Sequence, residues 1–194
     1  MTLSRFTSKS AAPLGATIEG SAPSDTKKIH IVTFGCQMNK YDSLLVEGRF
    51  RGKGYATTES LDEADVVLFN TCSVREHSEE RTFSWLGELK KVKESRPELV
   101  IGVMGCMAQR VEQEVFRRAG HVDIVVGTRR FQHLPELVEE LLERRSSPDR
   151  YRPQDMRLLD VEMADEVEVG REGEKYAGVL HGYLAVMRGC DLNC

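Results

Sequence analysis

The sequence of 194 residues predicts an α/β fold in which a parallel sheet carries helices on both of its faces. Two observations support this prediction. Short apolar segments, rich in β-branched residues, alternate along the chain with longer segments whose apolar residues recur at helical spacing. The short segments are apolar almost throughout, which is typical of strands covered on both faces. Alternation of such strands with helices indicates a parallel sheet, because each parallel connection must cross over the sheet.

Four strand-and-helix units make up the predicted sheet domain. The expected strands are residues 29–34, 66–69, 99–104 and 122–126. The apolar residues expected to face the sheet are Tyr41, Leu44, Leu45 and Gly48 in the first helix, Trp85, Leu86, Leu89 and Val92 in the second, Val111, Val115 and Phe116 in the third, and Leu134, Leu137, Val138, Leu141 and Leu142 in the fourth. Asn39 with Asp42 is expected to cap the first helix, and Ser73 with Glu76 predicts a capping box for the second.

The composition divides the chain into four regions. Residues 1–26 are rich in Ser, Ala, Thr and Pro and predict a disordered tail. Residues 27–146 hold the α/β domain, and residues 147–178 are interpreted as a linker. Residues 179–194 begin a further strand with no helix after it, so we expect the chain to be a fragment or a truncated protein.

Within the linker, the balance of charge changes sharply. Acidic residues outnumber basic ones seven to one between Asp160 and Glu174. An acidic segment between two domains indicates exposure to solvent. An edge strand is expected at its start, around residues 157–161.

The overall composition narrows the function classes. A net charge of −4 argues against a dedicated nucleic-acid-binding module, which needs a surplus of Lys and Arg. The sequence contains neither an apolar run of the roughly 20 residues that span a membrane nor a signal-peptide core. We therefore expect a soluble, cytoplasmic protein without membrane contacts. Five cysteines in no secreted disulfide pattern are expected to be metal ligands, catalytic thiols or core residues.

Three of the cysteines occupy equivalent positions. Cys36, Cys72 and Cys106 each follow one of the first three predicted strands. Ligands of open parallel sheets bind beyond the carboxyl ends of the strands. Because neighbouring strands lie about 4.8 Å apart, three adjacent strand ends place these residues within roughly 10 Å of one another. A shared inorganic site is the favoured interpretation, with ordinary core packing and redox chemistry as alternatives.

The donor set narrows the kind of site. Sets of thiolates select zinc or iron–sulfur clusters, and structural zinc usually binds four ligands in closely spaced pairs. Here single cysteines are separated by 34 to 36 residues. Three thiolates suit a 4Fe-4S cluster with one iron left open. His77 can complete a zinc site, although a surface position in the second helix is the expected one.

Cys190 and Cys194 give a separate signal. Cys-x-x-x-Cys after a strand is the first part of the Cys-x-x-x-Cys-x-x-Cys loop that holds a 4Fe-4S cluster and leaves one iron for S-adenosylmethionine. The third cysteine of that loop would fall three residues beyond Cys194. By itself the pair has little specificity.

Taken together, these motifs resemble the methylthiotransferase family of radical S-adenosylmethionine enzymes, and within it the tRNA-modifying branch. The resemblance extends over residues 28–194. The residues that carry it are 35–39 (Gly-Cys-Gln-Met-Asn), 41–43 (Tyr-Asp-Ser), 64–65 (Ala-Asp), 70–76 (Asn-Thr-Cys-Ser-Val-Arg-Glu), 105–109 (Gly-Cys-Met-Ala-Gln), 122–123 (Val-Asp), 127–128 (Gly-Thr), 188–190 (Arg-Gly-Cys) and Cys194. As an ordered set they are highly specific.

The resemblance implies a fold, two clusters and a reaction. It implies a flavodoxin-like N-terminal domain with an auxiliary 4Fe-4S cluster on Cys36, Cys72 and Cys106. It assigns Cys190 and Cys194 to the radical cluster of a partial β/α barrel, which uses S-adenosylmethionine. The implied reaction adds a methylthio group to isopentenylated adenosine beside the tRNA anticodon. The implied partners are the anticodon stem-loop of tRNA and an electron donor protein, and no oligomeric state is implied.

The chain also departs from the family pattern. It lacks the third cysteine of the radical site, the rest of the barrel and the C-terminal RNA-binding module. We therefore expect this chain to bind the auxiliary cluster but not to cleave S-adenosylmethionine alone. An inert flavodoxin-like interaction module and a structural zinc domain stay open as alternatives.

A few further residues are candidates for supporting roles. Gln37, Asn39 and Asn70 are candidate hydrogen-bond donors to cluster sulfurs, with turn and capping roles as the alternative. Arg75 and Arg110 are candidates for contact with RNA phosphate, although solvated arginines are common at helix starts. Trp85 is expected in the core.

Overall fold

The structure is a computed structural model that describes residues 26–73, 76–147, 149 and 153–162. It contains one six-stranded parallel sheet with strand order β2-β1-β3-β4-β5-β6. The strands are β1 (Lys28–Phe34), β2 (Ala56–Thr57), β3 (Val66–Thr71), β4 (Val100–Gly105), β5 (Ile124–Val126) and β6 (Leu158–Asp160). The helices are α1 (Gln37–Gly52), α2 (Glu76–Ser95), α3 (Cys106–Val111), α4 (Glu114–Arg118) and α5 (Leu134–Ser146), with short 3-10 turns η1 (Leu61–Glu63), η2 (Phe131–His133) and η4 (Pro153–Met156). The predicted α/β fold class is confirmed.

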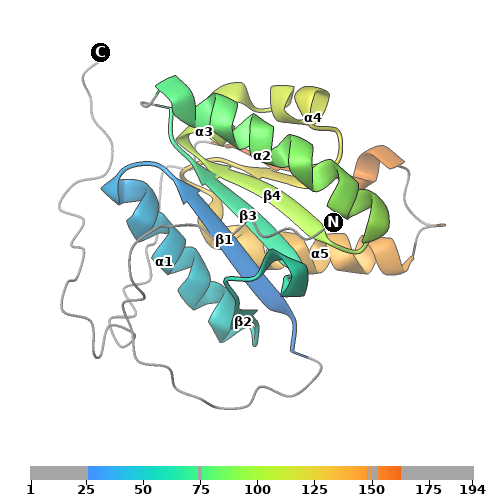
Figure 1. Cartoon of the computed structure of the whole chain (residues 1–194). Coiled ribbons are helices and arrows are strands. Elements are labelled where there is room, and N and C mark those ends of the chain that lie inside the picture. Colours follow the sequence, from blue (N-terminus) through green and yellow to red (C-terminus); the bar gives the residue numbers. More distant parts are fainter. Residues whose placement is uncertain (1–25, 74–75, 148, 150–152, 163–194) are drawn as a thin grey trace.

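Helices cover both faces of the sheet, as the continuous apolar strands indicate. Helices α1 and α5 lie on one face, and α2, α3 and α4 lie on the other (Figure 1). Along β3, Leu68 belongs to the core beneath α1 and α5, whereas Val67 and Phe69 belong to the core beneath α2 and α3. Every residue of β3 and β4 is buried. Two apolar cores therefore hold the central strands from opposite sides.

The register of the central strands aligns their carboxyl ends. Phe34 of β1 pairs with Thr71 of β3, and Thr71 pairs with Gly105 of β4. These three residues close their strands in a single row. The loops that follow β1, β3 and β4 consequently start side by side at one edge of the sheet.

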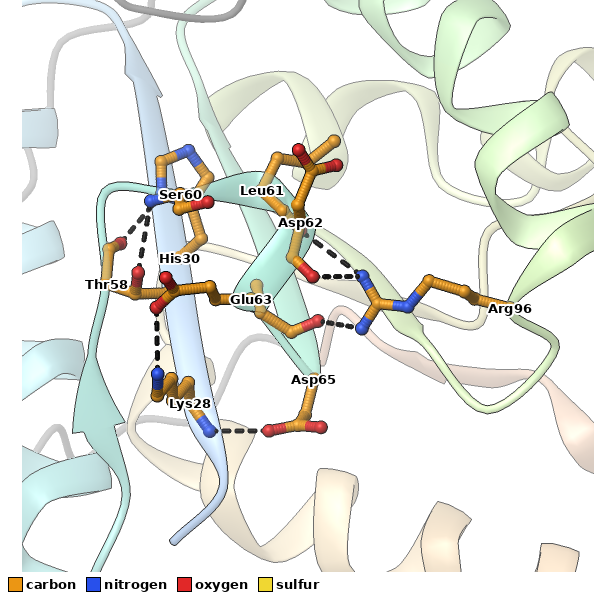
Figure 2. Close-up of polar contacts among 10 residues, drawn as sticks. Lys28, His30, Thr58, Ser60, Leu61, Asp62, Glu63, Asp65 and Arg96 are labelled. Atoms are coloured by element: carbon orange, nitrogen blue, oxygen red, sulfur yellow. Dashed lines mark hydrogen bonds and ion pairs between the residues drawn. The ribbon is translucent and has the colours of Figure 1, made fainter. Parts of the chain in front are cut away.

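The opposite edge, where the strands begin, is held by ion pairs and by contacts of basic side chains with backbone carbonyls. Figure 2 shows Lys28 beside Glu63, with an Nζ to Oε2 distance of 2.8 Å, and the Lys28 backbone N–H donating to Asp65. The guanidinium of Arg96 donates to the carbonyl oxygens of Asp62 at 2.9 Å and Ala64 at 2.6 Å. These contacts join β1, the η1 turn and the segment before β4.

A second ion cluster lies deeper at the same edge. Asp123, immediately before β5, accepts from Lys93 at 2.8 Å and Arg145 at 2.5 Å, and also from the backbone N–H of Ile101. Asp123 is buried. Its carboxylate therefore connects α2, α5 and β4 at the edge of the sheet where the strands begin.

The predicted face of α1 is only partly right. Leu45 packs against the core as expected, but the buried residues are Asn39, Asp42, Val46 and Phe50, and Leu44 is exposed. Apolar periodicity misplaced this face because two of its four buried residues are polar. The N-cap of α1 is Cys36 rather than Asn39, whose side chain completes the capping box from the third helical position.

The third predicted helix is two short helices. A break at Glu112, whose φ of 44° lies in the left-handed region, separates α3 from α4. Both helices still pack on the same core through Met107 and Val115. The short strand β2 was not predicted, since two residues give no periodicity.

The edge strand predicted around residues 157–161 is present as β6, which pairs with β5. The predicted tail, most of the predicted linker and the start of the predicted second domain lie outside the described residues. Among the residues that the structure describes, no helix has both the length and the apolar character needed to cross a membrane.

Candidate functional site at the carboxyl edge of the sheet

The three predicted cysteines lie at one edge of the sheet, after three neighbouring strands. Cys36 caps α1 two residues beyond β1, Cys72 directly follows β3, and Cys106 directly follows β4 as the first residue of α3. All three are free cysteines. Cys72 is buried, Cys36 is half-buried and Cys106 is exposed. The structure thus brings together three thiols that lie 34 to 36 residues apart in the sequence.

The thiols are close enough to influence one another electrostatically. The pKa of Cys106 is raised above the ordinary value, chiefly because protein atoms around this otherwise exposed residue displace water from its sulfur. Negative charge on Cys72, Asp42 and Cys36 raises it further. A cationic group bound among these side chains would reverse this effect, because positive charge favours thiolates.

Three thiolates from three separate loops fit an iron–sulfur cluster by their chemistry. Among the side chains that the structure describes, no group of three His, Cys, Asp or Glu forms a site for a single metal ion. In a 4Fe-4S cluster each cysteine binds its own iron. The residues that would hold such a cluster are Cys36, Cys72 and Cys106.

Two buried asparagines lie directly beneath the cysteines. Asn39 is 2% exposed and Asn70 is 0% exposed. The Nδ2 of Asn39 donates to Asn70 Oδ1 at 2.8 Å and to the Thr71 carbonyl at 3.2 Å. The Nδ2 of Asn70 donates to the Asn39 carbonyl at 2.7 Å and to Ser43 Oγ at 2.9 Å. The two amides therefore join α1 to β3 at the site.

The same amide of Asn39 also contacts a cysteine. Its Oδ1 accepts from the Cys36 backbone N–H at 3.1 Å and from the Cys36 thiol at 3.4 Å. In this structure the N–H groups of Asn39 and Asn70 are bonded to other partners, and Asn39 takes the capping role that was the alternative. Asn39 meets the sulfur of Cys36 as an acceptor.

Gly105 permits a close approach of β4 to β3 just before Cys106. Its φ is 100°, in the region that favours glycine. A Cβ at this position would lie 2.5 Å from the Thr71 carbonyl oxygen and 2.7 Å from Asn70 Oδ1. The backbone before Cys106 therefore packs directly on the backbone before Cys72.

The remaining predicted residues lie in varied places. Gln37 is exposed in the first turn of α1, and Trp85 packs partly buried on the core under α2. Arg110 is exposed and forms an ion pair with Glu79. Arg75, the side chains of Glu76 and His77, and the two cysteines Cys190 and Cys194 lie outside the described residues.

The structure places two further residues at the site, of which the sequence predicted only a capping role for Asp42 and a place in the family motif for both. Ser43 bonds both Thr33, at 2.8 Å between hydroxyl oxygens, and Asn70. Asp42 is buried and acts on the pKa of Cys106. Asp42 and Ser43 follow Asn39 by three and four residues, so a polar stripe on α1 was the available signal.

A hydrogen bond joins α3 to the segment that follows β6 at this edge of the sheet. The Nε2 of Gln109 donates to the Val161 carbonyl at 2.8 Å. The Oε1 of Gln109 is buried, finds no hydrogen-bond partner among the residues that the structure describes, and would lie 2.0 Å from a Cβ at Gly127. Glycine at position 127 thus leaves room for this side chain beside β5 and β6.

Comparison with known proteins identifies the family of this chain. The model of the family described as "Uncharacterized protein family UPF0004" matches residues 28–127, about half of the chain. That stretch includes β1 to β5 and all three site cysteines.

Curated relatives share one name, tRNA-2-methylthio-N(6)-dimethylallyladenosine synthase. The protein from Dictyoglomus thermophilum is 49% identical over 59% of this chain and 26% of its own length. A Sulfurihydrogenibium protein is 42% identical over 86% of this chain and 36% of its own. The Erwinia tasmaniensis protein is 38% identical over 87% of this chain and 34% of its own. The chain spans about a third of the length of these relatives. By its matching residues and its sheet edge with three cysteines, the chain belongs to the UPF0004 family.

Proposed function

We propose that this chain is the cluster-binding N-terminal part of a tRNA methylthiotransferase. The single observation that carries the proposal is the placement of Cys36, Cys72 and Cys106 after three adjacent parallel strands. The names of relatives at 38–49% identity support the reaction class, a transferase that modifies tRNA. Isopentenylated adenosine beside the anticodon is the proposed substrate of the full-length enzyme, with S-adenosylmethionine as its second cofactor.

In this proposal the chain's residues place and protect the auxiliary centre. A 4Fe-4S cluster with one open iron supplies a binding point for sulfur. Cys36 and Cys106 stand at the starts of α1 and α3, where positive charge on a bound cluster would favour their thiolates. Cys72 is 1% exposed, so its side of the centre is shielded from water by the protein. Cys190 and Cys194 are proposed ligands of the radical cluster, and an electron donor protein and cytoplasmic localisation are also proposals.

The cluster is tested by anaerobic reconstitution with iron and sulfide. We expect about four iron and four acid-labile sulfide per chain with broad visible absorption, and loss of both in Cys72→Ala. The double variant Cys190→Ala/Cys194→Ala is the matched control and should keep the cluster. A colourless wild-type chain without iron would contradict the assignment and favour the inert module. Stoichiometric zinc in place of iron would favour the structural zinc domain.

The reaction is tested with a chimera. This chain replaces the matching third of the Sulfurihydrogenibium relative, and the chimera is expressed in a bacterium that lacks its own methylthiotransferase. We expect methylthiolated isopentenyladenosine in digested tRNA by mass spectrometry, and none from the chimera with Cys72→Ala. A soluble wild-type chimera with a bound cluster but no modified nucleoside would count against the proposed substrate.

A further inference from the structure

Two buried amides at this edge of the sheet need a physical reason. Asn70 lies in β3 after Val66, Val67, Leu68 and Phe69, all fully buried. Burying an amide is costly unless each of its polar atoms is hydrogen-bonded. In this fold the cost is offset by Ser43 and by Asn39, which is itself buried in the first turn of α1.

The amide of Asn39 is fully used, and its partners are the loops of the site. A carboxamide offers two N–H donors and two acceptor positions. Asn39 donates to Asn70 and to the carbonyl of Thr71, whose peptide bond leads to Cys72. Its oxygen accepts both bonds from Cys36. One side chain therefore connects the first cysteine to the backbone of the second.

Asn70 extends the same connection to the third cysteine. Its Oδ1 lies so close to Gly105 that a Cβ there would approach it to 2.7 Å. Gly105 immediately precedes Cys106. Its Nδ2 is bonded to the carbonyl of Asn39 and to Ser43, which fixes the orientation of the amide. Together the two asparagines contact all three loops: Asn39 bonds Cys36 and Thr71, and Asn70 lies beside Gly105.

We propose that the Asn39–Asn70 pair is a positioning device that fixes the spacing of Cys36, Cys72 and Cys106 before any cluster binds. Neutral amides suit this role because they add no charge to a centre that already gathers thiolates. A ligand set held in place by packed neighbours binds metal with less ordering cost. The inference deepens the proposed function and rests on it for the identity of the bound group.

The first test measures the spacing without a cluster. In a Cys190→Ala/Cys194→Ala background, the apo chain is treated with dibromobimane, which fluoresces strongly only after both arms have reacted with thiols. We expect rapid cross-linking in the chain with Asn39 and Asn70 intact, and severalfold slower cross-linking in Asn39→Ala and Asn70→Ala. Equal rates in all three chains would overturn the inference.

The second test measures how firmly a reconstituted cluster is held. We expect iron release to a chelator to be about 10- to 100-fold faster in Asn39→Ala and Asn70→Ala than in the wild type. Asn70→Asp keeps an oxygen that accepts from Asn39 but adds charge and loses the bonds donated to the Asn39 carbonyl and Ser43, so it should release iron at least as fast as Asn70→Ala. Wild-type retention in Asn70→Asp would contradict the need for a neutral, donating amide.

A control separates positioning from stability. Asp123→Asn breaks the ion cluster at the other edge of the sheet, far from the cysteine loops, and lowers the denaturation midpoint. Asp123→Asn should release iron at the wild-type rate. If it releases iron as fast as Asn39→Ala does, lost stability explains the fast release in both variants and the positioning role is overturned. If the wild type takes up no cluster, the proposed function fails, while the cross-linking result still decides the inference on spacing.

Discussion

The two edges of the same sheet are built from different chemistry. At the edge where strands begin, Asp123, Lys93 and Arg145 form a buried ion cluster, and Arg96 donates to backbone carbonyls. At the edge where strands end, Asn39 and Asn70 form a neutral amide network beneath three thiols. The charged groups of the ion cluster satisfy one another, whereas the amides of Asn39 and Asn70 order the loops and leave the cysteine sulfurs available for a ligand.

Position along the strands explains the division. The carboxyl ends of parallel strands are where successive loops meet and ligands bind. At the ends of β1, β3 and β4 the amides of Asn39 and Asn70 join the cysteine loops, and Asp42 is a buried acidic side chain near the thiols. The ion pair of Arg130 with Asp160, at 2.7 Å, lies further along this edge, at the ends of β5 and β6. Ion pairs at the amino ends, such as the one between Lys28 and Glu63, cross-link elements without entering the site (Figure 2).

The largest expected loss of stability comes from breaking the ion cluster of Asp123, Lys93 and Arg145. Asp123→Asn leaves Lys93 and Arg145 without their buried anion, and losing one partner of a buried ion cluster is expected to cost about 3 kcal/mol. Urea denaturation followed by circular dichroism measures the change in the free energy of unfolding. A loss below about 1 kcal/mol, the size found for exposed pairs, would show that the cluster contributes little.

A smaller loss of stability is expected from one added methyl group at Gly105, next to Cys106. Gly105→Ala places a Cβ 2.5 Å from the Thr71 carbonyl at a φ of 100°, so we expect a loss of about 2 kcal/mol. Iron retention should fall as well, because the loop before Cys106 must shift. Gly87→Ala is the matched control. Gly87 lies in α2 with nothing within 4 Å of its added Cβ, and a gain of about 0.5–1 kcal/mol is expected. Equal effects of the two substitutions would contradict the close approach.

The smallest expected effect is a loss of stability at acid pH through His121, which lies shortly before β5. Burial holds the pKa of His121 below its ordinary value of 6.5, although a bond to the Leu86 carbonyl opposes the shift. Because the unfolded chain then binds more protons as the pH falls below 6.5, the stability contributed by neutral His121 is lost in that range. We expect His121→Gln to lose less stability than the wild type between pH 7 and pH 5. Parallel pH profiles in urea would contradict this.

Parts of the site were predictable because they depend on local order. Each cysteine follows a strand that its own apolar run identifies, as Val66 to Phe69 does for Cys72. Parallel topology then places such loops at one edge. The face of α1 was not predictable from hydrophobicity, because its buried residues include the polar Asn39 and Asp42, and Asn39 is bonded to β3 and to Cys36.

Strands β1, β3, β4 and β5, the α/β class and the order of the three cysteines follow from the sequence, because hydrophobic periodicity and spacing are local properties. The register that aligns Phe34, Thr71 and Gly105 emerges only in the folded chain, since it depends on pairing between distant segments. The meeting of Asn39 and Asn70 likewise depends on the fold. Their hydrogen bonds span 31 residues of sequence, and only the packing of α1 on β3 brings the two amides within reach of each other.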